Sequence, residues 1–152
     1  MTAAQSRKFI YKNSITWQGE KKGFLAAGDK PGFPIATPPE FRGHAGVWSP
    51  EDLFVASVNG CIMTTFLHYA ERKGLELLSY ETEAEGILDR VENQFRFSGI
   101  IVKPVIAVKD NGDIQRAGDF LVLAEKGCLI SNSIKARITV IPEIKQGVDK
   151  CR

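Results

Sequence analysis

Residues 49–74 read SPEDLFVASVNGCIMTTFLHYAERKG, and this stretch decides the fold. It opens with a helix start: Ser49 can cap, Pro50 suits the first helical position, and two carboxylates follow in the first turn. Basic side chains in the last turn and Gly74 just beyond them predict the end of the helix equally clearly. The pattern predicts one helix over roughly 50–73, about 36 Å long at 1.5 Å per residue.

The middle of this helix is uncharged. Eighteen residues from Leu53 to Ala70 carry no charge and twelve of them are apolar, which approaches the length of a membrane span. Polar side chains such as Asn59 and His68 are spread through the segment, and no second stretch of this kind occurs. We therefore interpret it as the buried central helix of a soluble domain rather than a membrane anchor.

The remaining segments predict sheets around this helix. Alternating apolar and polar residues, with turn residues between them, predict strands at 8–17, 24–27, 79–90, 94–109 and 136–141. A second helix is expected from the cap at Asn111-Gly112-Asp113 to Gly127, followed by a short helix or turn over 128–134. This order predicts an α+β fold with antiparallel pairing, in a single domain over 1–152 with a polar tail at 143–152.

Prolines mark two further expectations. Five of the seven prolines lie between Gly28 and Pro50, which predicts an irregular but shaped loop there. Pro104, inside a strand-like stretch, predicts an edge position or a bulge.

Composition narrows the class of partner. The 152 residues are 43% hydrophobic and 25% charged, with a net charge of +2 and no run of like charges. This argues against nucleic acid or an acidic membrane as a partner and favours small molecules or proteins. No long apolar run follows the N-terminal residues, so a secretory signal is not supported and the cytoplasm is the expected location.

Most cofactor and hydrolase motifs are absent. The sequence has no GxGxxG, no GxxxxGK[ST], no HExxH and no GxSxG. His44 and His68 have no metal-ligand company at short spacing, so we expect neither a metal nor a cofactor.

The cysteines are the strongest candidates for chemistry. Cys61 lies about three turns inside the helix, where the dipole no longer acts, so its thiolate needs a cation from elsewhere. Cys128 follows Gly127 at a possible new helix start and has the better local case for a lowered pKa. Cys151 is expected to be exposed and incidental. Each buried thiol could also be a small packing residue.

Two stretches together resemble a known family. Residues 49–61, SPEDLFVASVNGC, and 125–133, EKGCLISNS, are similar to the OsmC and organic hydroperoxide reductase family. The resemblance implies an intertwined α+β homodimer in which antiparallel sheets wrap long central helices, and it implies an antioxidant role in stress responses. Cys61 would attack an organic hydroperoxide and become a sulfenic acid, which Cys128 would resolve to a disulfide. A dithiol, in this family typically a lipoyl group, would restore the thiols.

The resemblance also implies residues around the thiol. A loop arginine holds the thiolate in the hydroperoxide reductase branch, and a glutamate matching Glu51 holds that arginine. The first turn of this chain carries Gln18, Lys21 and Lys22 instead, so Arg42 is the nearest loop arginine. An apolar mouth is expected from Phe41, Trp48 and Phe54, unless these three are core residues.

Two other functions remain open from the residues. In one, the protein is a binding or redox-responsive module whose cysteines do not catalyse a reaction. In the other, it has a thioesterase-like fold, which leaves the pairing of Cys61 with Cys128 unexplained. A cation within about 4–6 Å of Cys61 would favour the peroxidase.

Overall fold

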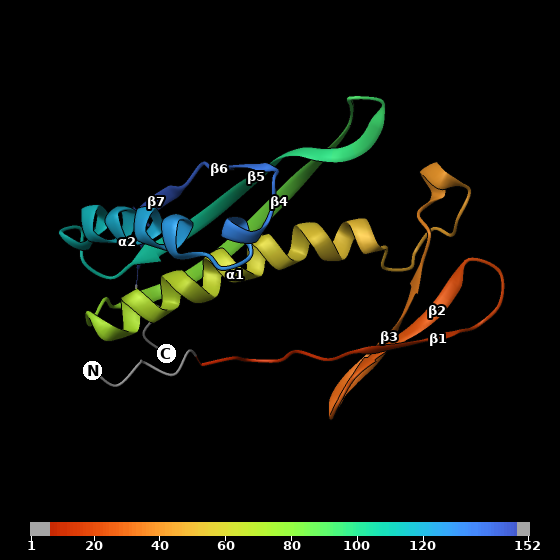
Figure 1. Ribbon diagram of the computed structural model, residues 1–152. Helices are drawn as coiled ribbons and strands as arrows, with labels where there is room; N and C mark the ends of the chain where they lie inside the picture. The colour runs from red at the N-terminus through yellow and green to blue at the C-terminus, as the bar shows by residue number, and fades with distance from the viewer. Residues whose placement is uncertain (1–6, 149–152) are drawn as a thin grey trace, which may run out of the picture. The chain divides into compact units, whose positions relative to one another are not determined.

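The computed structural model describes residues 7–148, which divide between Leu53 and Phe54 into two compact units. The elements, labelled in Figure 1, are β1 (Ser14–Trp17), β2 (Lys22–Ala27), β3 (Lys30–Ala36), the 3-10 turn η1 (Pro39–Phe41), α1 (Pro50–Arg72), β4 (Leu77–Val91), β5 (Gln94–Val108), α2 (Asp113–Gly127), the 3-10 turn η2 (Ser131–Ser133), β6 (Arg137–Val140) and β7 (Glu143–Gln146). The α+β fold class predicted from the sequence is confirmed.

The first unit contains an antiparallel sheet in the order β1-β2-β3. Its first strand is shorter than predicted, because residues 8–13 have no regular structure. The loop predicted between Gly28 and Pro50 is wrong in part, since β3 occupies 30–36. Pro31 and Pro34 are tolerated there because β3 is an edge strand of this sheet, where a missing N–H breaks no ladder on the outer side.

The start of α1 is closed by a capping box. The backbone N–H of Asp52 donates to Ser49 Oγ at 3.1 Å. In return, Asp52 Oδ2 accepts from the Ser49 backbone N–H at 2.9 Å and from its hydroxyl at 2.8 Å. Two otherwise unpaired groups at the helix start are thereby satisfied. The helix ends at Arg72, and Gly74 adopts a left-handed φ of 65° just beyond it, as the sequence predicts.

The second unit contains a sheet in which β5 is central. β4 pairs with β5 antiparallel, whereas β6 and β7 both pair with β5 in parallel. The prediction of antiparallel pairing is therefore wrong for these two strands. The physical reason is that α2 is a crossover connection, which carries the chain back so that the next strand runs alongside β5. Within the predicted polar tail, residues 143–146 form β7, and its Ile144 packs against the core.

Pro104 lies inside the central strand β5, and its expected edge position is wrong. β6 pairs with residues 99–102 of β5, and β7 pairs with residues 105–108. Pro104 thus faces the break between the two parallel strands, so its missing N–H removes no strand-to-strand hydrogen bond on that side.

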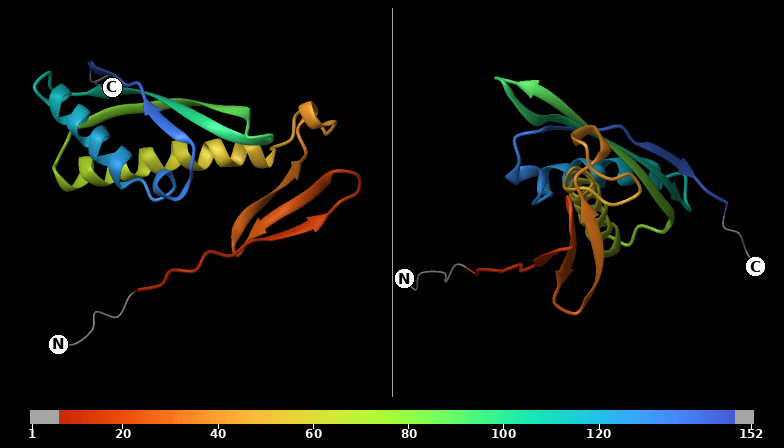
Figure 2. Two further views of the ribbon diagram at one scale, coloured as in Figure 1. Left: turned by 45° about the horizontal axis from the view of Figure 1, so that its top comes forward. Right: turned by 90° about the vertical axis from the view of Figure 1, so that its right-hand side faces the viewer.

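Both helices cover one face of this sheet (Figure 2), and the core of the second unit lies between them and β5. Its fully buried side chains include Phe66 of α1, Ile100 and Ile106 of β5, and Ala124 of α2. Every second residue of β5 contributes, which fits a strand with one face toward the helices.

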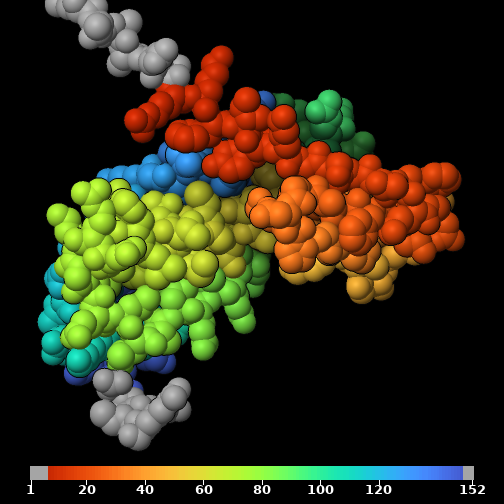
Figure 3. Space-filling view, turned by 90° about the horizontal axis from the view of Figure 1, so that it is seen from below, coloured from red at the N-terminus to blue at the C-terminus, as the bar shows by residue number. Residues whose placement is uncertain are grey.

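Only one stripe of α1 is buried in the single chain. Its members recur every four residues: Val58, Ile62, Phe66 and Ala70. In Figure 3 the yellow and yellow-green atoms of α1 lie at the surface of the chain, so the predicted central helix is covered on one side. By length and composition alone α1 could cross a membrane, but core helices of soluble proteins meet the same two criteria.

Candidate functional site

The structure brings Cys61 and Cys128 together, although they are far apart in the sequence. Cys61 lies on α1 and is half-buried, whereas Cys128 ends α2 and is 0% exposed. Their thiols are joined by a hydrogen bond. Both are free cysteines at the edge of the same hydrophobic core. Cys61 is thus the more accessible of the two cysteines.

The environments of the two sulfurs push their pKa values in opposite directions. Burial raises the pKa of Cys61, but hydrogen bonds from Cys128 and from the backbone N–H groups of Ile130 and Leu129 lower it more, so the net shift is downward. Burial raises the pKa of Cys128, and its hydrogen bond to Cys61 raises it further. Cys61 is therefore the readier thiolate.

This result corrects the sequence analysis, which favoured Cys128 as the readier thiolate. The turn after Cys128 does present backbone N–H groups to a sulfur. However, the groups of Leu129 and Ile130 act on Cys61, and only the N–H of Ser131 donates to Cys128, at a long 3.4 Å. The local turn thus favours ionisation of the distant thiol more than of its own.

The expected cation is not what lowers the pKa of Cys61. Within residues 7–148, the groups that lower it are all neutral: a thiol, two backbone amides and the hydroxyl of Thr65. Hydrogen bonds to the charged form favour ionisation just as an opposite charge does, and they need no positive side chain.

Thr65 is a residue of this site that the sequence analysis missed. Its hydroxyl donates to the carbonyl oxygen of Cys61 at 2.7 Å, and the hydroxyl of Thr64 donates to the same oxygen at 3.1 Å. The signal was present in the sequence, because a threonine four residues after a helical residue can reach back to that residue's carbonyl.

The other predicted site residues lie elsewhere in the chain. Glu51 stands in the first turn of α1, and its Oε2 atom is buried with no hydrogen-bond partner in the described part of the chain. Arg42 is exposed, directly after η1, with a left-handed φ of 58°. Trp48 is 53% exposed and Phe41 is 38% exposed, whereas Phe54 is half-buried and stacks on Phe97 at 4.7 Å between ring centroids.

The two lysines of the first turn are engaged within their own unit. Lys21 Nζ donates to the carbonyl oxygen of Phe41 at 2.9 Å. Lys22 forms an ion pair with Glu20 at 3.2 Å.

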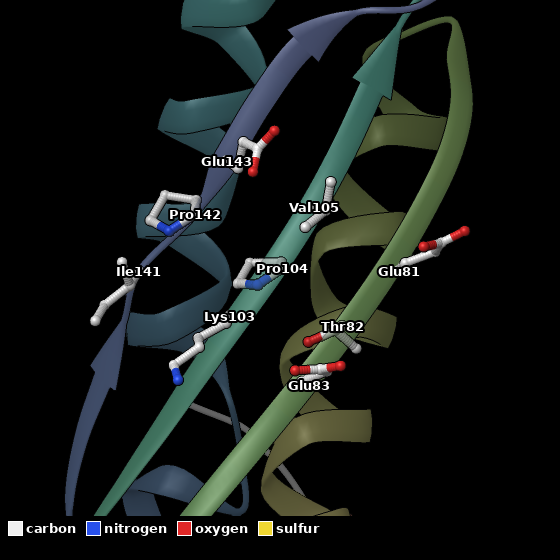
Figure 4. A pocket seen from close by; sticks show the side chains of 9 residues that line it. All are labelled: Glu81, Thr82, Glu83, Lys103, Pro104, Val105, Ile141, Pro142 and Glu143. Atoms are coloured by element: carbon white, nitrogen blue, oxygen red, sulfur yellow. The ribbon is translucent and has the colours of Figure 1, made fainter.

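A groove lies on the face of the second sheet that is turned away from the helices (Figure 4). It is lined by Glu81, Thr82, Glu83, Lys103, Pro104, Val105, Ile141, Pro142 and Glu143. Its lining includes no thiol and one basic side chain, which forms an ion pair with Glu85 at 2.9 Å.

Comparison with known proteins identifies the family. A family profile described as OsmC-like protein matches residues 43–143, about two thirds of the chain. The chain belongs to the OsmC family. Peroxiredoxin OsmC of Escherichia coli (strain K12) is 27% identical to this OsmC-family chain over 139 residues, which cover 88% of the chain and 96% of the relative. An uncharacterized protein, YmaD of Bacillus subtilis (strain 168), is 27% identical over 107 residues, covering 68% and 71%.

Solved structures show that the OsmC-family fold extends over the described chain. An OsmC-like protein of unknown function from Vibrio cholerae has a TM-score of 0.80 at 18% identity, covering 89% of this chain and 99% of that one. The organic hydroperoxide resistance protein OhrB of Bacillus subtilis has a TM-score of 0.64 at 22% identity, covering 90% and 98%. The family resemblance seen in the sequence is thus confirmed.

Proposed function

We propose that this OsmC-family chain is a thiol-dependent peroxidase that reduces organic hydroperoxides. The observation that carries the proposal is the hydrogen-bonded pair of thiols, with a half-buried Cys61 whose pKa is lowered and a buried Cys128 whose pKa is raised. Thiolates, not thiols, are the nucleophiles, so a lowered pKa on the accessible sulfur is what the first step requires.

The proposed reaction has two chemical steps. The Cys61 thiolate attacks the distal oxygen of the hydroperoxide, the O–O bond breaks, and the alkoxide leaves and takes up a proton to become an alcohol. Cys61 is then a sulfenic acid. Cys128 attacks its sulfur, a disulfide forms, and the hydroxyl leaves as water with the proton of Cys128. A dithiol, such as a lipoyl group, reduces this disulfide and regenerates both thiols.

The spacing of Glu51 and Cys61 along α1 supports a role for Glu51 across a homodimer. Ten residues of α-helix rise by about 15 Å, so a glutamate at 51 and a thiol at 61 of the same helix do not meet. Glu51 reaches a Cys61 only across two antiparallel helices. The buried, unpartnered Oε2 of Glu51 is then available to Arg42, whose guanidinium supplies a charge near the thiolate in the homodimer.

The uncovered side of α1 supports the same homodimer. Ser57 and His68 are exposed there, and a Cβ added to Gly60 meets no atom within 4 Å. This side of α1 is free to pack on a second copy of the chain, whose α1 offers a matching face.

Phe41, Trp48 and Phe54 are our candidates for an apolar entrance that admits the alkyl part of the peroxide. We assign the protein to the cytoplasm.

The peroxidase proposal is tested by treating the fully reduced protein with about one equivalent of cumene hydroperoxide and mapping the oxidised cysteines by non-reducing peptide mass spectrometry. We expect a rapid, stoichiometric Cys61–Cys128 disulfide. Cys61→Ser should abolish peroxide consumption, and Cys128→Ser should leave a trappable sulfenic acid on Cys61. Cys151→Ser is the matched control and should behave as the wild type. Two intact thiols after minutes would overturn the proposal in favour of a binding module.

The homodimer is tested by analytical ultracentrifugation. We expect a dimer for the wild type, a shift toward monomer for Ser57→Arg on the open side of α1, and no shift for Gln115→Arg on the exposed surface of α2. A monomeric wild type at micromolar concentration would contradict the proposed assembly.

A further inference from the structure

The carbonyl oxygen of Cys61 has more donors than it can bond. It accepts from the hydroxyl of Thr65 at 2.7 Å and from the hydroxyl of Thr64 at 3.1 Å. The backbone N–H of residue 65 is directed at the same oxygen by the regular α-helix. A carbonyl oxygen has two lone pairs, so three donors leave one surplus.

Thr65 is the donor that has another acceptor within reach. Its hydroxyl is among the groups that lower the pKa of the Cys61 thiol, whereas that of Thr64 is not among them. Thr64 is exposed, but Thr65 is half-buried.

The methyl group of Thr65 faces Gly127. A Cβ added to Gly127 would lie 3.6 Å from the methyl carbon of Thr65, so the methyl group faces the end of α2. With the methyl on that side, the hydroxyl points back along α1 toward Cys61.

We propose that Thr65 is a positioning residue for the Cys61 thiolate: its hydroxyl proton turns from the carbonyl oxygen to the sulfur when the thiol ionises. Thr64 and the helix backbone keep the carbonyl oxygen bonded, so the movement leaves no acceptor unpaired. The inference rests on the proposed function only in taking Cys61 as the nucleophile. It adds to the thiol of Cys128 and the two backbone amides a neutral donor that belongs to the same helix as Cys61.

The test compares three variants, each made in the full-length chain that also carries Cys151→Ser. Thr65→Val removes the hydroxyl and keeps the shape, Thr65→Ser keeps a hydroxyl, and Thr64→Val removes the neighbouring hydroxyl as the matched control. The rate of Cys61 alkylation by iodoacetamide is followed against pH by peptide mass spectrometry. We expect Thr65→Val to react about threefold to tenfold more slowly at neutral pH, because a hydrogen bond to a charged group is lost.

The pH profile separates this role from a merely structural one. In Thr65→Val the inflection should move to higher pH, and the rate should approach the wild-type rate once the thiol is fully ionised. Thr65→Ser and Thr64→Val should follow the wild-type profile. If Thr65→Val fails to fold, which near-ultraviolet circular dichroism reports, Thr65→Ala carries the same expectation.

Two results would overturn the inference: a Thr65→Val profile that superimposes on the wild type, or an equal shift in Thr64→Val. Alkylation needs no peroxide, so this outcome is independent of whether the protein consumes hydroperoxides. A chain that fails the peroxide test can still show the expected profiles, and the reverse also holds.

Discussion

Gly86→Ala is expected to loosen the packing of α1 on the sheet, because there is no room for one more carbon at this position. A Cβ on Gly86 would clash with a methyl carbon of Val55 and would lie 2.7 Å from the ring of Phe97. Phe97 cannot move aside freely, since it stacks on Phe54 at 4.7 Å between centroids. Overpacking of this kind costs about 1–3 kcal/mol, and the less flexible unfolded chain offsets about 0.4–1 kcal/mol of it.

The net expectation for Gly86→Ala is a loss of about 1–2 kcal/mol, or roughly 2–8 °C in Tm for a chain of this size. Thermal and urea unfolding measure it. Val55→Ala should relieve the clash, so the double variant should be more stable than the sum of the single changes by about 1 kcal/mol. Gly118→Ala is the control with the opposite sign: its Cβ would meet Ile144 at an ordinary 3.7 Å, and alanine favours helix α2 by about 1 kcal/mol. A Gly86→Ala protein as stable as the wild type, with no coupling to Val55, would refute the reasoning.

Three further changes have outcomes that follow from single contacts. Tyr80→Phe should raise stability at neutral pH by up to about 1 kcal/mol, because the buried hydroxyl has no partner within residues 7–148. Burial also raises the pKa of Tyr80 to about 12, so the wild type should lose stability from pH 10 to pH 12 as Tyr80 ionises in the unfolded chain. Unfolding curves at alkaline pH should show a smaller loss of stability for Tyr80→Phe. Equal losses in the two proteins would contradict this. Cys128→Ala should move the alkylation profile of Cys61 to higher pH, because a hydrogen bond to its sulfur is lost; an unmoved profile would show that Cys128 does not act on it. Ser49→Ala should cost about 0.5–2 kcal/mol in urea unfolding through the lost cap, and no loss would mean that the capping box is dispensable.

The helices could be predicted from the sequence because their signals are local. The cap at Ser49 and the stop at Gly74 bracket α1 to within one residue of its observed end. The errors fall where distant segments decide the structure. β3 is rich in proline and is stabilised by its neighbour β2, and β7 is polar on one side and is held by β5 and α2. Parallel pairing has no local signature, since it depends on where a crossover helix returns the chain.

The pair of thiols could be expected from the sequence, but the electrostatics of the pair could not. The pairing of Cys61 with Cys128 followed from the family resemblance, because nothing in their spacing brings two such distant residues together. The direction of the pKa shifts could not be predicted, since the amides of Leu129 and Ile130 act on a thiol of another helix. Thr65 was within reach of sequence reasoning through its spacing of four residues from Cys61.

The place of Cys128 in the crossover has a consequence for newly made chains. It lies between α2 and β6, so its sulfur reaches Cys61 only when the crossover has returned the chain to the sheet. In an unfolded chain the two thiols are the ends of a long, open loop and seldom meet. The proposed disulfide should therefore form quickly only in molecules that have finished folding. If an oxidant is added during protein synthesis, we expect the disulfide between Cys61 and Cys128 in folded chains and not in nascent ones.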